Sequence, residues 1–290
     1  MIEKERIKKI EEVTLSVSKI NLFYECPRKY LYRYLYTFDK PIISSSWPAS
    51  GLGDGVHKVI EWANKTKKEG VDNKAIINNA PIEFQKTYDN WLIKNKATFK
   101  KSKGYNYETF MKNGMKYSST IVKFFFSYFE DHIDVLPELE FEITYDLCDN
   151  VKLKGIIDIM YFFKDSYKII DFKTTKDSNK FYFIDWSIDT QSLMYIYYAM
   201  QQYKTLPESF SYMVFNHEQK TIFFKETFLE KRKNIFKGLT YQLEDVRDFT
   251  LKPDLNLVNP AQQKCYWCEY KDECEKKYKT SLKSMLGKIK

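Results

Sequence analysis

Residues 153–173 read LKGIIDIMYFFKDSYKIIDFK, with two apolar runs that each end in an aspartate, Asp158 and Asp171. Apolar, β-branched runs of this length predict two buried strands joined by a tight turn. Residues two apart in a strand share a face, so Asp171 and Lys173 should point together while Phe172 turns to the opposite face. A charge placed against an apolar sheet needs a partner. The sequence therefore predicts that the two acids and the lysine converge.

Two carboxylates beside a lysine can hold a divalent cation through hard oxygen ligands and orient a water for attack on phosphate. The simpler interpretation is an ion pair between Asp171 and Lys173 that only shapes the sheet, the commoner role of an isolated Asp-x-Lys. Here the motif is not isolated. Upstream, GDGVH at 53–57 opens an expected helix, and downstream Gln191 and Tyr195 stand four apart, on one face of another expected helix.

In chain order, the GxxxH, GIID, IIDFKT and QxxxY motifs resemble the RecB-type branch of the PD-(D/E)XK nuclease superfamily, over the range from Ser16 to about Cys274. The resemblance implies an α/β fold with a restriction-endonuclease-like core, in which helices flank a mixed sheet. It implies four ligands for magnesium or manganese: His57, Asp158, Asp171 and the carbonyl of Phe172. It also implies that Lys173 positions or activates the attacking water, and that Gln191 and Tyr195 line the DNA-binding side of the site.

The strand before GIID departs from the pattern of the family. The family often has an acidic residue on the strand before GIID, and here Glu138, Glu140 and Glu142 all stand on that strand. Alternation puts the three on one face, so the choice among them stays open.

The chain has five cysteines, Cys26, Cys148, Cys265, Cys268 and Cys274, and the last three have the spacing C-x2-C-x5-C. That run alone is more often half of a zinc knuckle. Four soft ligands suit an iron–sulfur cluster or zinc, but four thiolates can meet only if the two ends of the chain fold together. With Cys26 far upstream, the pattern resembles the iron–sulfur staple of helicase-associated and CRISPR-associated RecB-type nucleases. The resemblance implies a 4Fe-4S cluster on Cys26, Cys265, Cys268 and Cys274, with Cys148 as a structural thiol.

At 290 residues and 43% hydrophobic content, the chain can bury a full core, and we expect one elaborated domain over 1–290. The polar, Lys- and Asn-rich stretch 69–136 is expected to be a helical insertion, and 251–290 a cysteine cluster segment with a basic tail. The other expected elements are helices over 14–38, 53–68, 187–203 and 228–247, strands over 138–146, 151–163 and 167–173, and a hairpin over 209–226.

The charge pattern and the lack of long apolar runs favour a cytoplasmic protein. The first residues are charged, and no apolar run is long enough to cross a bilayer, so no membrane contact is expected. Cytoplasmic thiols stay reduced, which favours metal or cluster ligation over disulfides. The net charge of +8 is compatible with a polyanionic partner.

Aromatic residues make up 17% of the chain, and the segment YECPRKYLYRYLY at 24–36 interleaves them with basic residues. Such a segment can stack unpaired bases while it holds the DNA backbone, or it can be an amphipathic helix whose tyrosines pack on the core. We take Arg28 and Tyr195 as candidate DNA contacts.

Together these patterns predict a metal-dependent exonuclease acting on single-stranded DNA ends in recombination, repair or DNA processing. No Gx4GK[ST] phosphate loop is present in the sequence, so ATP-driven unwinding would come from a separate helicase or recombination subunit. The alternative is a protein of the same fold that binds DNA or a partner without cutting, with zinc on the cysteines. Cleavage polarity, the choice between exonuclease and endonuclease, and the host pathway stay open.

Overall fold

The computed structural model describes residues 7–38, 48–95, 107–129, 135–163, 165–182, 185, 189–229, 234–253 and 268–274. The chain forms two compact units. We call residues 1–44, 142–154 and 237–290 the terminal unit, and residues 45–141 and 155–236 the sheet unit. The organisation as one elaborated domain stays a prediction.

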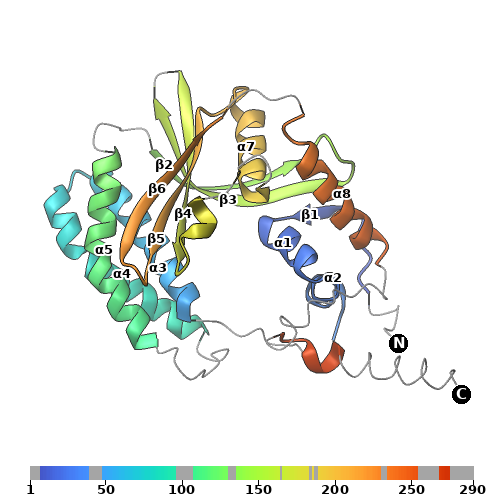
Figure 1. Cartoon of the computed structure of the whole chain (residues 1–290), viewed down its shortest axis with the longest axis horizontal. Coiled ribbons are helices and arrows are strands. Elements are labelled where there is room, and N and C mark those ends of the chain that lie inside the picture. The colour runs from blue at the N-terminus through green and yellow to red at the C-terminus, as the bar shows by residue number, and fades with distance from the viewer. Residues whose placement is uncertain are drawn as a thin grey trace, which may run out of the picture. The chain divides into compact units, whose positions relative to one another are not determined.

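A mixed sheet forms the centre of the sheet unit (Figure 1). The strands of the sheet that lie wholly or mostly in this unit are β2 (Val135–Thr144), β3 (Val151–Phe163), β4 (Ser166–Thr175), β5 (Ser209–Asn216) and β6 (Thr221–Phe228). β2 pairs with β3, β3 is antiparallel to β4, β4 is parallel to β5, and β5 is antiparallel to β6. The strands predicted over 138–146, 151–163 and 167–173 and the hairpin predicted over 209–226 are therefore confirmed, and so is the α/β class.

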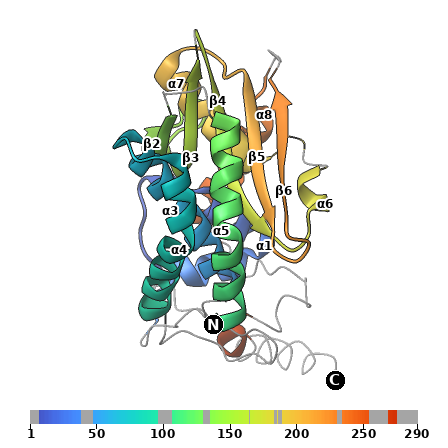
Figure 2. The same ribbon diagram turned by 90° about the vertical axis from the view of Figure 1, so that its left-hand side faces the viewer.

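Helices flank this sheet on both faces. On one face lie three long helices, α3 (Pro48–Lys68), α4 (Asn73–Asn95) and α5 (Tyr107–Phe129) (Figure 2). On the other face lies α7 (Thr190–Tyr203), and the short α6 (Asn179–Tyr182) follows β4. The helices expected in 69–136 are thus α4 and α5, and the expected helix that carries His57 is α3.

The three long helices pack closely because glycines make room for one ring. Phe84 of α4 is fully buried in the core of the sheet unit. A Cβ added to Gly55 of α3 would lie 2.6 Å from the Phe84 ring, and a Cβ on Gly114 of α5 would overlap that ring even more. Phe84 therefore fills a notch that two helices form with residues lacking a side chain.

We expect Gly114→Ala to lower the free energy of unfolding by ~1–3 kcal/mol, because overpacking forces a buried ring to move. The matched control is Gly238→Ala, also in a helix, where no atom lies within 4 Å of the added Cβ. That change should raise the free energy of unfolding by up to ~1 kcal/mol, since alanine is the better helix former. Urea denaturation measures the free energy of unfolding of both variants. Equal changes in the two would contradict the close packing of Phe84 against Gly114.

The terminal unit contains a short strand and several helices. They are β1 (Val13–Leu15), α1 (Val17–Glu25), α2 (Pro27–Tyr30), the π-helical turn η2 (Leu31–Leu35) and α8 (Lys237–Leu251). β1 pairs in parallel with the first residues of β3, Val13 opposite Val151. Ser16 caps α1 by accepting a hydrogen bond from the backbone N–H of Lys19 at 3.4 Å.

Two predicted helix boundaries need correction. The helical segment expected over 14–38 begins only at Val17, because the short strand β1 precedes it. Within this segment Cys26 is a helix junction with an extended backbone (φ −164°, ψ 105°). Pro27, which has no N–H to donate, starts the next helix. The helix expected over 228–247 is α8, which begins at Lys237 because β6 continues to Phe228.

Candidate active site

The site begins where β3 and β4 separate. The backbone pairing of these strands includes Ile159 opposite Ile170. One position further, the Oδ2 atom of Asp158 accepts the backbone N–H of Phe172 at 2.7 Å. The carboxylate of Asp158 thus takes the place of the backbone carbonyl that would accept this N–H in a regular strand pair. The hydrogen bond fixes the orientation of the carboxylate between the two strands.

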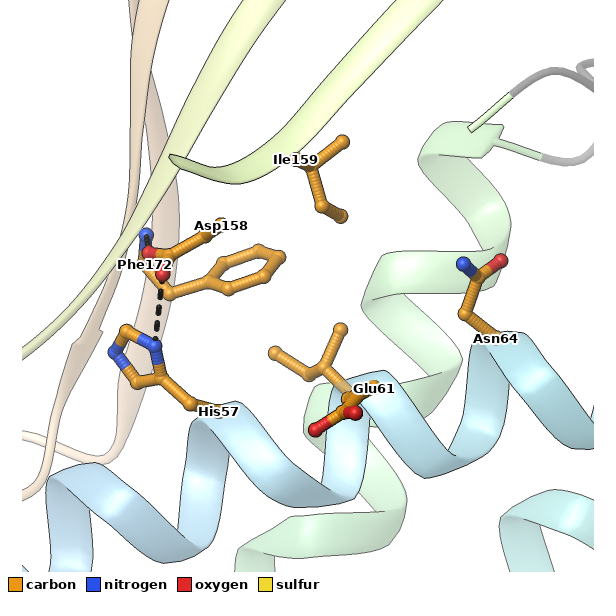
Figure 3. Close-up of a pocket in the computed structure, with 7 residues that line it drawn as sticks. His57, Glu61, Asn64, Asp158, Ile159 and Phe172 are labelled. Atoms are coloured by element: carbon orange, nitrogen blue, oxygen red, sulfur yellow. Dashed lines mark hydrogen bonds and ion pairs between the residues drawn. The ribbon is translucent and has the colours of Figure 1, made fainter. Parts of the chain in front are cut away.

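His57 reaches the same carboxylate from α3 (Figure 3). Its Nδ1 atom lies 3.1 Å from Oδ1 of Asp158, and its side chain is 31% exposed. Burial alone would lower the pKa of His57, but the carboxylate of Asp158 outweighs it and raises this pKa. Burial would likewise raise the pKa of Asp158, yet His57 and the Phe172 N–H lower it. Each partner therefore favours the charged form of the other.

Asp171 lies at the centre of a second set of contacts and is only 1% exposed. Lys173 forms an ion pair with it, and Nε2 of Gln191 donates a hydrogen bond to its Oδ1 at 2.6 Å. Burial raises the pKa of Asp171 despite the opposing pull of Lys173. Phe172 packs with the three long helices on the opposite face. The predicted alternation of these three residues is confirmed.

Tyr195 supports this arrangement from behind. It is 5% exposed, and its hydroxyl accepts a hydrogen bond from Gln191 at 2.9 Å. A Cβ on Gly155, the glycine of GIID, would lie 2.7 Å from the ring of Phe141 and 3.2 Å from that of Tyr195. That glycine is thus required by close packing behind the site. The assignment of Tyr195 and of Arg28 in the terminal unit as DNA contacts stays a prediction, and the burial of both side chains argues against it.

A small pocket of about 10 Å³ adjoins His57, with room for about one water (Figure 3). Glu61 and Asn64 line it from α3. Glu61 bonds to Lys58 at 2.8 Å, so it is a helix-surface carboxylate that borders the site. Asn64 is 6% exposed, and its Nδ2 has no hydrogen-bond partner among the described residues. Sequence reasoning missed Asn64, although positions 57, 61 and 64 share one helical face.

Comparison with known proteins decides the family. The family model of the PD-(D/E)XK nuclease superfamily matches residues 14–275. The chain belongs to this superfamily. Members are typically nucleases that act on DNA and usually use magnesium or manganese. No curated protein matches the sequence.

One solved structure, "Crystal structure of SSO0001", is similar at 12% identity over 73% of this chain and 91% of that one. Its TM-score is 0.31. Among the described helices, none combines the length and apolarity that crossing a bilayer requires.

The donor atoms of the site suit the metals of the superfamily. Two carboxylates, one imidazole and a backbone carbonyl are ligands that magnesium and manganese accept. No three His, Cys, Asp or Glu side chains of the described residues lie close enough together to hold a metal ion. His57 contacts Asp158, while Asp171 contacts Lys173 and Gln191. A cation held by His57, Asp158 and Asp171 would therefore require these side chains to exchange their mutual contacts for the ion.

The choice among the three candidate acids before GIID stays open. Glu140 and Glu142 are exposed, and the side chain of Glu138 lies outside the described part of the structure. Glu142 belongs to the terminal unit, where it interacts electrostatically with Lys19.

The cysteines of this superfamily member are confined to the terminal unit. Cys26 lies at the junction of α1 and α2, and Nη1 of Arg28 lies 3.7 Å from Sγ of Cys274. Burial raises the pKa of Cys268, and the nearby Cys26 adds to that effect. Cys265 lies outside the described residues. Cys148 is buried, and its Sγ accepts a hydrogen bond from Arg247 at 3.0 Å, as expected of a structural thiol.

Proposed function

We propose that this protein is a magnesium- or manganese-dependent deoxyribonuclease of the RecB type that degrades single-stranded DNA from its ends. The convergence of Asp171 and Lys173 with Asp158 and His57 carries the proposal. The paired strand ends place two carboxylates and an ammonium group within one small region, which suits hydrolysis of a phosphodiester. A separate helicase or recombination subunit as supplier of unwound strands, and a role in recombination, repair or processing, belong to the same proposal.

Each residue has a role in this proposal. His57, Asp158, Asp171 and the Phe172 carbonyl would hold the cation, which when bound neutralises phosphate charge and lowers the pKa of a water. Lys173 would hold the attacking water and stabilise the negative charge that develops on phosphorus-bound oxygens. Gln191 keeps the carboxylate of Asp171 oriented through its 2.6 Å hydrogen bond. Tyr195 positions Gln191 in turn.

Digestion of end-labelled DNA tests the proposal. Linear single strands, circular single strands and blunt duplexes are incubated with the protein in magnesium, manganese or EDTA. We expect progressive loss of nucleotides from linear single strands in either metal, slower attack on duplex ends, and no reaction in EDTA. Cleavage of the circular strand would contradict exonuclease action. Absence of cleavage on every DNA would favour the non-cutting alternative.

We further propose that Cys26, Cys265, Cys268 and Cys274 hold a 4Fe-4S cluster. The packing of 268–274 against α2 and η2 supports this, because it brings Cys268 and Cys274 toward Cys26. Glu269 forms ion pairs with Lys29 at 3.5 Å and with Arg33 at 3.9 Å. The ring of Tyr270 contacts that of Tyr32 at 5.6 Å.

Cys26→Ser is expected to lose most of the bound iron and to lower the melting temperature by at least ~5 °C. Cluster binding stabilises the folded state, and the loss of one ligand removes that stabilisation. Iron analysis, visible absorbance and thermal unfolding check this. The matched control is Cys148→Ser, which should keep its iron. Full iron content in Cys26→Ser would contradict the long-range staple, and zinc in place of iron would favour the zinc alternative.

A further inference from the structure

Two neighbouring aromatic residues, Phe181 and Tyr182 of α6, lie beside the candidate active site and have no role in the proposed chemistry. In α6, Phe181 is buried and contacts the ring of Tyr212 on β5 at 5.5 Å. The next residue, Tyr182, is 49% exposed and stacks on Phe223 of β6, with ring centroids 4.5 Å apart and ring planes inclined by 8°. One ring thus anchors the helix, and the other is presented on the surface.

Strand register places Phe223, on which Tyr182 stacks, on the face of the sheet that carries Asp171 and Lys173. Lys173 lies opposite Val214, and Val214 lies opposite Phe223. Residues opposite one another in a sheet share a face, so Phe223 and Lys173 are two strands apart on the same side. At the usual strand spacing, their backbones are about 10 Å apart.

The same face carries two lysines, Lys225 and Lys173, the latter ion-paired with Asp171. Lys225 follows Phe223 by two residues on β6 and lies opposite Tyr212, which in turn lies opposite Asp171. The ammonium group of Lys173 lies 5.7 Å from the centroid of the Tyr212 ring. Lysines beside an exposed ring form the combination that holds a nucleic acid strand by its backbone and by one base.

A buried polar network keeps α6 in position. Asn216 at the end of β5 is fully buried, and its Nδ2 donates to Oγ of Ser178 at 2.7 Å and to the carbonyl of Lys176 at 3.2 Å. These bonds fix the segment that joins β4 to α6. The exposed face of Tyr182 is therefore preorganised, so little ordering entropy would be lost when a ligand stacks on it.

We propose that the outer face of Tyr182 stacks an unpaired base of the DNA strand being cut, one to a few nucleotides from the scissile phosphate. The inference rests on the proposed nuclease function and identifies a residue that gives it a preference for single strands. Single-strand DNA steps by ~3.4 Å per nucleotide when its bases are stacked, so a span of about 10 Å fits this distance. A base-paired strand keeps its bases stacked on their neighbours, so it gains less from the ring. Tyr195, with its buried ring, is not open to this role.

Binding measured in EDTA tests the inference without cleavage. The ligands are a fluorescent single strand containing 2-aminopurine and a blunt duplex of the same sequence, each titrated across a salt series. Tyr182→Ala should weaken single-strand binding by roughly 5- to 100-fold, the range expected for one stacked base. Duplex affinity and the salt slope should stay nearly unchanged, because the phosphate contacts remain. Quenching of 2-aminopurine by the wild type should be lost.

Two further variants separate stacking from structure. Tyr182→Phe keeps the ring and should bind as the wild type does. Tyr241→Ala removes a tyrosine that is 56% exposed on α8, in the terminal unit, and should leave both affinities unchanged. Thermal unfolding of each variant shows whether the fold is intact.

An unchanged single-strand affinity in Tyr182→Ala, or an equal loss for single strand and duplex, would overturn the inference. If the wild type still degrades DNA in manganese, that result leaves the proposed nuclease function standing. If the wild type neither binds nor cleaves DNA, both are overturned.

Discussion

Asp171→Asn is expected to reduce DNA cleavage by roughly 10³-fold while single-strand DNA affinity is kept or increased. Asparagine has the shape of the aspartate and can still contact Gln191, but it lacks the charge that a cation requires. Loss of a negative charge also lessens repulsion of phosphate. Single-turnover cleavage and equilibrium binding measure the two effects separately.

The matched control for this change is Asp165→Asn, which alters an exposed carboxylate in the turn between β3 and β4. Its cleavage rate should equal that of the wild type within error. Thermal unfolding shows whether each variant is folded. A folded Asp171→Asn protein that cleaves at the wild-type rate would remove Asp171 from the catalytic centre.

Lys173→Met is expected to reduce cleavage by roughly 10²- to 10³-fold, because its ammonium group no longer stabilises the charge that develops in the transition state. Methionine retains much of the length of the side chain, so packing against β5 should persist. Divalent cation binding should also persist, since lysine is not a ligand. This separation of catalysis from metal binding distinguishes Lys173 from the two aspartates.

Lys152→Met is the control for the loss of an ion-paired lysine. Lys152 pairs with Glu12 at 2.9 Å in the terminal unit, and such surface pairs contribute little to stability. Its cleavage rate should match that of the wild type. If Lys173→Met also matches, then Lys173 serves only as the partner of a buried carboxylate, which is the simpler interpretation of the Asp-x-Lys motif.

The part of the site that follows from local periodicity was predictable from the sequence. Alternation alone placed Asp171 and Lys173 on one face and Phe172 on the other, and the i, i+4 spacing placed Gln191 with Tyr195. The central strands were predictable for the same reason, because apolar runs bounded by turn signals indicate buried strands. The superfamily was predictable from the resemblance of the GxxxH, GIID, IIDFKT and QxxxY motifs, since periodicity alone indicates only the α/β class.

Features that depend on contacts between distant segments were not predictable. The hydrogen bond from the Phe172 N–H to Asp158 exists because two strands separate at one position, which no local pattern specifies. The burial of Tyr195 arises from Phe141 and Phe210, on two other strands. Helix propensity alone indicates only that Gly114 weakens its helix. The contact with the Phe84 ring, which explains the glycine, depends on a helix distant in the sequence.

Titration of the protein with manganese, followed by calorimetry, tests most directly whether His57, Asp158 and Asp171 form one metal centre. We expect that the wild type binds the ion, that Lys173→Met binds it equally well, and that His57→Ala, Asp158→Asn and Asp171→Asn each weaken binding by at least ~10-fold. Manganese binding that is unchanged in all three ligand variants, each shown to be folded, would contradict a single metal centre formed by these residues.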